Sequence, residues 1–288
     1  MRAYLPDYHL EKARSLDEAL RILSKKKDED LTIIAGGTDL MVRFAEGSLQ
    51  QRRFLSIEGI KELKGIKESK DQIEIKCLTT FSEISGHKSI KKYVPLVSIA
   101  AKEIGSIAIQ NRATIGGNIM NASPAADSPP TLLVYDASLK LVSSGGERIV
   151  DIKDFYLGYK KMNVRKDEIL QSVIINKPIR QAKGYFRKVG PRNAMAISKV
   201  VLAGTGIKDK GIIKHIRLSF GSLAPTVVRA TKVEEFVIGK KFGFELVKNA
   251  KELLYHEISP IGDIRSTEEY RRAVAGNILE QCLETLFR

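Results

Sequence analysis

Apolar positions near the start of the chain follow first the spacing of a helix and then that of a strand. Apolar residues recur at helical spacing after Ser15, and Glu18 lies three positions later, which is the capping-box arrangement that begins a helix. The β-branched run 31–35 predicts a short buried strand. The glycine pair 36–37 ends this strand, and Thr38 is then expected to cap a second helix.

The middle of the chain continues this mixture of strands and helices. Its predicted strands are 54–57, 73–77 and 169–175, together with a hairpin of 138–143 and 148–152 around a Gly-Gly turn. Its predicted helices are one that begins at a capping box of Thr80 and Glu83, one over 95–104 and a short one over 131–135.

The pattern changes after a polar stretch at 177–183 that contains a proline. Beyond it, antiparallel strands are predicted over 185–189, 197–207 and 212–220, and helices over 244–255 and 266–286, the last with a capping box of Ser266 and Glu269. We therefore expect an α+β fold in two parts. The first domain would cover 1–177, with subdomains of about 1–58 and 59–177, and a smaller domain would cover 184–288.

Composition narrows the class of protein without naming a function. The 288 residues are 43% hydrophobic and 28% charged, an ordinary globular balance. No apolar run reaches the roughly 18 residues that cross a bilayer, and the N-terminus lacks the apolar core of a secretory signal. A soluble, cytoplasmic protein is expected. With two distant cysteines, no CxxC pair and no metal-binding histidine spacing, we expect no metal site in the chain.

The net charge of +14 has three interpretations. The first is a solvated, lysine-rich surface. The second is attraction to an anionic cofactor or an acidic partner protein. Nucleic-acid binding ranks third, because the basic residues are scattered and no nucleic-acid-binding signature accompanies them.

Two glycine-rich segments are the main candidates for binding chemistry. They are Ile33-Ile34-Ala35-Gly36-Gly37-Thr38-Asp39-Leu40 and Thr114-Ile115-Gly116-Gly117-Asn118. Glycine lets backbone amides approach a phosphate closely, and helix N-termini favour anions. Two such bends, remote in sequence, could hold a pyrophosphate from both sides. Each pair alone is more typical of an ordinary turn than of a phosphate site. Neither a GxGxxG fingerprint nor a GxxxxGK[ST] loop is present, so Rossmann and P-loop sites are not expected.

A longer string gives these segments a specific context. The run 112–130, with 35–40 upstream, closely resembles the FAD-binding subunits of the xanthine dehydrogenase and aerobic carbon monoxide dehydrogenase family. The segments 168–170, 186–188 and Ser266-Thr-Glu-Glu-Tyr-Arg-Arg272 resemble that family in the same order, so the likeness covers nearly the whole chain.

The resemblance implies a vanillyl-alcohol-oxidase-like (PCMH-type) FAD-binding fold, followed by a smaller domain of antiparallel strands and helices. By similarity, 33–40 and 114–118 would line the adenine–ribose–pyrophosphate channel. Asp127 would lie near the ribityl chain, and Leu170 and Lys188 would reach the flavin end. Ile104 stands where the xanthine dehydrogenases have an aromatic residue, so aromatic stacking does not carry over.

Physical reasoning offers two roles for each of two charged residues in this set. Asp127 could accept a strong hydrogen bond from a ribityl hydroxyl, or could cap the helix that follows it. Lys188 could place positive charge near the pyrimidine edge of the flavin, or could be a surface lysine on a strand.

The resemblance also implies partners. In that family a large subunit carries the molybdenum cofactor, a small subunit carries two 2Fe–2S clusters, and the flavin subunit passes electrons to NAD, a quinone or oxygen. We therefore expect a hetero-oligomer with no nucleic acid and no membrane span. Two alternatives remain open: a self-sufficient flavin-dependent oxidase of a small molecule, and a basic nucleic-acid-binding module.

Overall fold

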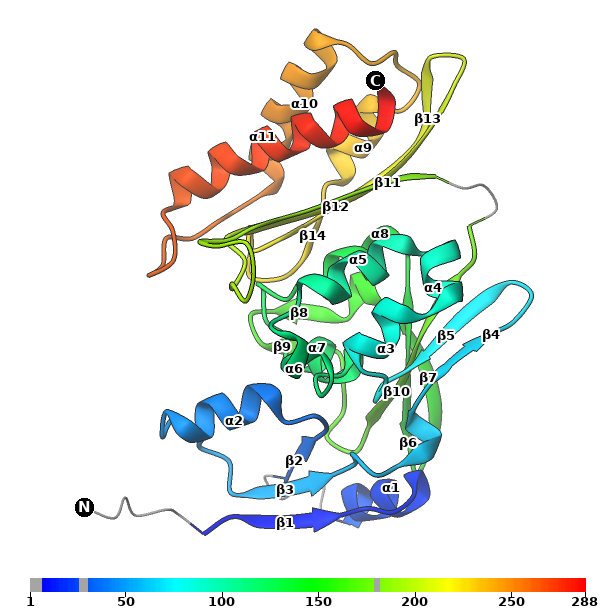
Figure 1. The fold of residues 1–288 in the computed structure, drawn as a ribbon, viewed down its shortest axis with the longest axis vertical. Helices are drawn as coiled ribbons and strands as arrows, with labels where there is room; N and C mark the ends of the chain where they lie inside the picture. Colours follow the sequence, from blue (N-terminus) through cyan, green and yellow to red (C-terminus); the bar gives the residue numbers. More distant parts are fainter. Residues whose placement is uncertain (1–6, 26–30, 179–181) are drawn as a thin grey trace.

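The computed structural model describes residues 7–25, 31–178 and 182–288, and these fold around three larger sheets and one two-stranded ribbon (Figure 1). Helices and strands both contribute throughout, which confirms the expected α+β class. No helix within those ranges is both long and apolar enough to cross a membrane.

A small parallel sheet opens the chain. Its strand order is β1-β3-β2, with β1 at His9–Lys12, β2 at Leu31–Ile34 and β3 at Arg53–Ser56. Helices α1 (Leu16–Lys25) and α2 (Thr38–Ala45) connect these strands. The Ser15 hydroxyl accepts the Glu18 amide at 3.2 Å, so the predicted cap of α1 is confirmed. The cap predicted for α2 is wrong, because Gly37 occupies the N-cap position and no side chain caps the helix.

The second sheet is antiparallel and holds the main core. Its order is β4-β5-β10-β6-β7, from Ile66–Glu68, Gln72–Lys76, Ile169–Asn176, Ser138–Ser143 and Gly146–Asp151. The helices beside it are α3 (Phe81–Gly86), α4 (Lys88–Tyr93), α5 (Pro95–Glu103), α6 (Ile107–Gln110), α7 (Ile115–Met120) and α8 (Ser128–Val134). The short turns η1 (Lys61–Leu63) and η2 (Ile152–Asp154) and the ribbon of β8 (Tyr156–Gly158) and β9 (Lys161–Met162) complete this part.

Two expectations for this middle region need correction. The helix predicted over 131–135 begins earlier, at Ser128, because the proline pair 129–130 lies in its first turn, where a missing N–H does no harm. The short helices α6 and α7 were not predicted. With four and six residues, these helices are too short to show an apolar period.

The third sheet is antiparallel, in the order β11 (Lys183–Val189), β12 (Val200–Asp209), β13 (Ile212–Gly221) and β14 (Val228–Arg229). Helices α9 (Thr231–Val237), α10 (Phe244–Glu257) and α11 (Glu268–Phe287) cover one face of it, and α5 and α8 contact the other (Figure 1). Leu96, Val134 and Ala203 form a small buried cluster between the two larger cores.

The start of the last helix also differs from its prediction. Thr267 is the N-cap of α11 and its hydroxyl accepts the Tyr270 amide at 3.2 Å. Ser266 instead belongs to a tight turn, since its amide donates to the Asp263 carboxylate at 3.0 Å. Thr267 and Ser266 are both good caps, and the competing turn decides between them.

Candidate functional site

The two glycine segments lie side by side. A Cβ atom on Gly36 would lie 1.9 Å from the carbonyl oxygen of Arg112 and 3.4 Å from the Cα of Ala113. The bend after β2 therefore packs directly on the backbone that leads into Thr114. Gly37 has a φ of +72°, in the left-handed region where glycine is favoured. The segment 33–40 thus approaches 112–118 through a contact that only a residue without a side chain allows.

The second glycine pair forms the first turn of α7 rather than a loop. Thr114 is the N-cap, and its hydroxyl accepts the Gly117 amide at 3.1 Å. Gly116 is buried against the end of β5, where a Cβ would lie 2.7 Å from the Cβ of Cys77. Our expectation of a turning loop at this pair is therefore wrong. Gly116 serves close packing, and Gly117 is the exposed member of the pair.

Polar contacts among Asp39, Asn121 and Lys160, here called the latch, join the two segments. Asn121 follows α7, and its side-chain amide donates to the Asp39 carboxylate at 3.1 Å. Lys160, in the turn between β8 and β9, donates to the carbonyl oxygen of Asn121 at 2.5 Å and to its Oδ1 at 3.1 Å. Burial lowers the pKa of Lys160, and the nearby Asp39 carboxylate opposes this shift. Asp39 is thus turned toward the latch.

Asn118 of α7 connects this helix to the start of α8. Its Oδ1 accepts the Ser128 hydroxyl at 2.6 Å, and Ser128 directly follows Asp127. The segment 114–118 and Asp127 are therefore joined by one hydrogen bond and one peptide link.

Asp127 and Lys188 form a buried ion pair. Their side chains are 10% and 7% exposed, and the ammonium nitrogen lies 2.7 Å from Oδ2 of Asp127. The Ser198 hydroxyl donates to the other carboxylate oxygen, and Lys188 also donates to the Glu103 carbonyl at 2.8 Å. Burial raises the pKa of the Asp127 carboxyl, while Lys188 and the Ser198 hydrogen bond oppose this rise.

This pair excludes one of the two roles that the sequence left open for each residue. Asp127 occupies the N-cap position of α8, but its carboxylate makes no capping hydrogen bond. Lys188 is buried, so a solvated surface lysine is the wrong description. A buried charge pair is expensive to form, which favours a requirement for charge at this place.

The two apolar site candidates lie in the core. Ile104 ends α5 and Leu170 lies at a register shift of β10, with exposed fractions of 8% and 3%. Ile104 adjoins Glu103, whose carbonyl holds Lys188. Leu170 is a packing residue of the main core.

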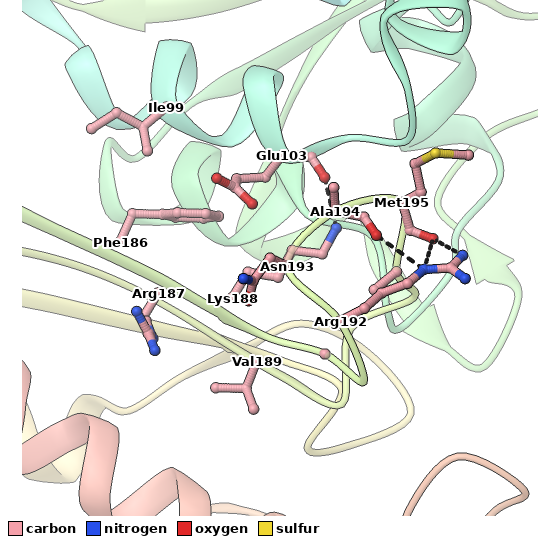
Figure 2. Close-up of a pocket in the computed structure, with 12 residues that line it drawn as sticks. Ile99, Glu103, Phe186, Arg187, Lys188, Val189, Arg192, Asn193, Ala194 and Met195 are labelled. Atoms are coloured by element: carbon pink, nitrogen blue, oxygen red, sulfur yellow. Dashed lines mark hydrogen bonds between the residues drawn. The ribbon is translucent and has the colours of Figure 1, made fainter.

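A cavity of about 340 Å³ borders the ion pair (Figure 2). Glu103 and Ile99 of α5 face it from one side and Phe186 and Lys188 of β11 from the other, whereas the Arg187 side chain points to the opposite face of the strand. The loop 190–196 closes one end, where Arg192 donates to the carbonyls of Ala194 and Met195 at 3.0 and 2.5 Å. No motif in the sequence indicated this loop. The acceptors of Arg192 are backbone carbonyls of the loop itself, and residues of any type provide such carbonyls.

The residues fit a dinucleotide cofactor on two counts. The bend at Gly36 and Gly37 has no side chain, and a Cβ at Gly36 could not be accommodated. From the second glycine segment, contacts lead through Asn118 to Asp127, and the buried Lys188 and the cavity lie beside Asp127. Asn121, Lys160 and Ser198 were missed as site residues, since a lone polar residue outside a motif carries no sequence signal.

Comparison with protein families covers almost the entire chain. Residues 6–178 match the family described as the FAD binding domain in molybdopterin dehydrogenase, and residues 185–286 match the CO dehydrogenase flavoprotein C-terminal domain. The glyceraldehyde dehydrogenase medium chain of Sulfolobus acidocaldarius is 34% identical over 274 residues, which is 94% of this chain and 95% of that relative. A putative xanthine dehydrogenase FAD-binding subunit of Escherichia coli is 30% identical over 266 residues, 92% of this chain and 90% of that one.

Solved structures agree with these sequence matches. A chain of the carbon monoxide dehydrogenase from Hydrogenophaga pseudoflava superimposes with a TM-score of 0.93 at 26% identity, covering 98% of this chain and 97% of that chain. This match confirms the expected PCMH-type FAD-binding fold followed by an antiparallel sheet with helices. The chain therefore belongs to the family of FAD-binding subunits of molybdenum hydroxylases, the oxidoreductases that include the xanthine and carbon monoxide dehydrogenases, and its cofactor is FAD.

Proposed function

We propose that this chain is the electron-transferring flavin subunit of its complex and passes electrons from a partner's 2Fe–2S clusters through FAD to an acceptor such as NAD or a quinone. The contact of Gly36 with the 112–113 backbone is the observation that carries the binding part of this proposal. It brings together two segments that are remote in sequence, and Gly36 carries no side chain where they meet.

The proposed binding residues follow the contacts from one end of the site to the other. Residues 33–40 and 114–118 would hold the adenine–ribose–pyrophosphate part, with the latch of Asp39, Asn121 and Lys160 keeping these segments closed. Asp127 would accept a ribityl hydroxyl, and Ile104, Leu170 and Lys188 would surround the flavin end. We also propose that the chain divides into a FAD-binding domain over 1–177 and a C-terminal domain over 184–288.

The protein's own groups set the charge at the flavin end. Bound FAD takes up two electrons and releases them singly or as a hydride. The Lys188 ammonium group lies at the cavity beside the Asp127 carboxylate, which partly balances its positive charge. Asp127 and the Glu103 carbonyl fix its ammonium group in place.

The cysteines of the chain point to clusters on a partner. Cys77 and Cys282 are both buried, and they belong to separate cores. Burial raises the pKa of Cys77 to about 12 and that of Cys282 well above its usual range, so neither offers a thiolate ligand. A large molybdenum-cofactor subunit and a small 2Fe–2S subunit are the partners that this division of labour needs, and the names of relatives such as the carbon monoxide dehydrogenase medium chain support such an assembly.

Reconstitution tests the cofactor part. The purified full chain incubated with FAD should retain flavin absorbance through gel filtration, whereas a colourless protein would contradict the proposal. Turnover of a small molecule by the isolated chain would favour a self-sufficient flavin oxidase instead.

The electron path is tested on the assembled enzyme. After FAD is removed, substrate should still bleach the cluster absorbance, but reduction of NAD or a quinone should stop. Acceptor reduction at the original rate without FAD would contradict the proposed order.

A further inference from the structure

Arg271 is a buried charge that the FAD site does not yet explain. It lies in the first turn of α11, only 4% exposed, within the 266–272 segment whose sequence resembles the family. A buried guanidinium is costly unless it is paired and hydrogen-bonded. One of its nitrogens, Nη2, donates to the Asp263 carboxylate at 2.8 Å, which supplies the pairing.

The second terminal nitrogen of Arg271 reaches the sheet beneath the helix. Its Nη1 donates to the carbonyl oxygens of Lys199 at 2.9 Å and Ser222 at 3.0 Å. Lys199 precedes β12 and Ser222 follows β13, so both carbonyls lie at the same end of two paired strands. The guanidinium therefore clamps the two chain segments that leave this end of the sheet.

Ser222 connects the segments that Arg271 binds to the ion pair of Asp127 and Lys188. Its φ of 65° is a left-handed conformation that a serine rarely adopts. Its hydroxyl donates to the Ser198 carbonyl at 3.0 Å, and its amide donates to the Pro124 carbonyl at 2.8 Å. Ser198 in turn donates its hydroxyl to Asp127. Both neighbours of Ser222 are thus segments that place Asp127.

We propose that Arg271 is a positioning residue for FAD binding, which acts through Ser222 and Ser198 to hold Asp127 and its partner Lys188 in their binding orientation. This inference rests on the proposed role of that pair toward FAD. Without Arg271, the Lys199 and Ser222 carbonyls would be left without their buried donor, and the 198–199 segment would relax toward water.

The neighbouring Arg272 offers a matched control. It occupies the same helical turn and also donates to a carboxylate and a carbonyl, Glu268 at 3.0 Å and Tyr255 at 3.0 Å. The Glu268 contact lies within α11 and the Tyr255 contact joins α11 to α10, and neither includes the 198–199 or 222 backbone. The Arg272 side chain is more exposed than that of Arg271, at 35% against 5%, so the loss of Tm is measured for both variants beside the Kd for FAD.

The test uses the full chain and measures the Kd for FAD by quenching of flavin fluorescence, with Tm as a check of folding. Arg271→Gln should weaken FAD binding about tenfold or more, as the loss of a charge-assisted hydrogen bond implies, while Arg272→Gln changes it less than about twofold. Should Arg271→Gln fail to fold, Arg271→Lys replaces it, because a lysine keeps the charge but cannot reach Asp263 and both carbonyls together. The lysine variant should show the same weakening to a smaller extent.

A double-mutant cycle separates positioning from plain destabilisation. If Arg271 acts through Ser198, adding Arg271→Gln (or Arg271→Lys) to Ser198→Ala should weaken FAD binding little beyond Ser198→Ala alone. Equal effects of the Arg271 and Arg272 variants, or additive effects of the Arg271 and Ser198 variants, would overturn this inference. Failure of the unaltered chain to bind FAD would instead overturn the proposed function.

Discussion

Gly36→Ala is the smallest change that should separate the two glycine segments. The added Cβ would lie 1.9 Å from the Arg112 carbonyl oxygen, about 1 Å closer than the 3.0 Å below which real Cβ atoms are essentially never found. The atoms that this Cβ would meet are all backbone atoms of residues 112 and 113, so no side-chain rotation relieves the clash. The 33–40 segment must therefore move away from 112–118 by about that distance.

The expected magnitude follows from this displacement. Overpacking of this kind costs about 1–3 kcal/mol, which lowers Tm by about 2–4 °C for each kcal/mol in a domain of 150–250 residues. Loss of one charge-assisted hydrogen bond to the pyrophosphate, worth about 1.5–3 kcal/mol, raises the Kd for FAD about tenfold or more.

The assay combines thermal unfolding with FAD titration of the full chain. Gly59→Ala is the matched control, because nothing lies within 4 Å of the position of its Cβ and its backbone is not left-handed. The control should keep the Tm and Kd of the unaltered chain. A Gly36→Ala chain that binds FAD as tightly as the control, with an unchanged Tm, would refute the reasoning.

Three further changes test other parts of the structure. Gly116→Val should lower Tm and FAD retention together, because its Cβ would lie 2.7–2.8 Å from atoms of the residue after β5; a stable, yellow protein would contradict this close packing. Lys188→Met should destabilise the chain by about 3–5 kcal/mol in urea unfolding, and adding Asp127→Asn should recover part of that loss, because the unpaired buried carboxylate is then removed. Glu168 accepts hydrogen bonds from Arg148, which lower its pKa below the ordinary 4.5, so its stabilising effect is present above pH 4.5 and is lost as the pH falls through the lowered value. Glu168→Gln should therefore flatten the fall in stability below about pH 5 in acid titrations followed by circular dichroism, and an unchanged slope would contradict this assignment.

Periodicity predicted the longer elements well, because a repeated apolar face is a signal summed over many residues. The hairpin around the Gly-Gly turn at 145–146 and the capping box at Thr80 are both present. Local capping choices were less predictable. Thr38 and Ser266 are suitable caps by residue type, but a left-handed glycine and a tight turn occupy the helix starts instead.

The glycine segments illustrate what spacing cannot say. Their sequences indicated bends, but not that Gly36 packs on the Arg112 carbonyl while Gly116 packs on the end of β5. Such contacts depend on how separate sheets are placed, which is a property of tertiary packing and not of local sequence.

The charged residues of the site could also be predicted only in part from the sequence. Lys188 lies on a strand that reads as half-exposed, and its burial arises from Asp127 and Glu103, which are more than 60 positions away. Neither Lys160 nor Arg271 was predicted to take part in the site. Their roles become visible only when their carbonyl partners are placed around them.

Hydrogen–deuterium exchange of the full chain, with and without saturating FAD, tests the binding site most directly. Residues 33–40 and 114–118 should gain protection together when FAD is added, since both would contact the same pyrophosphate. FAD binding that protects neither segment, or only one of them, would contradict a cofactor held between the two glycine pairs.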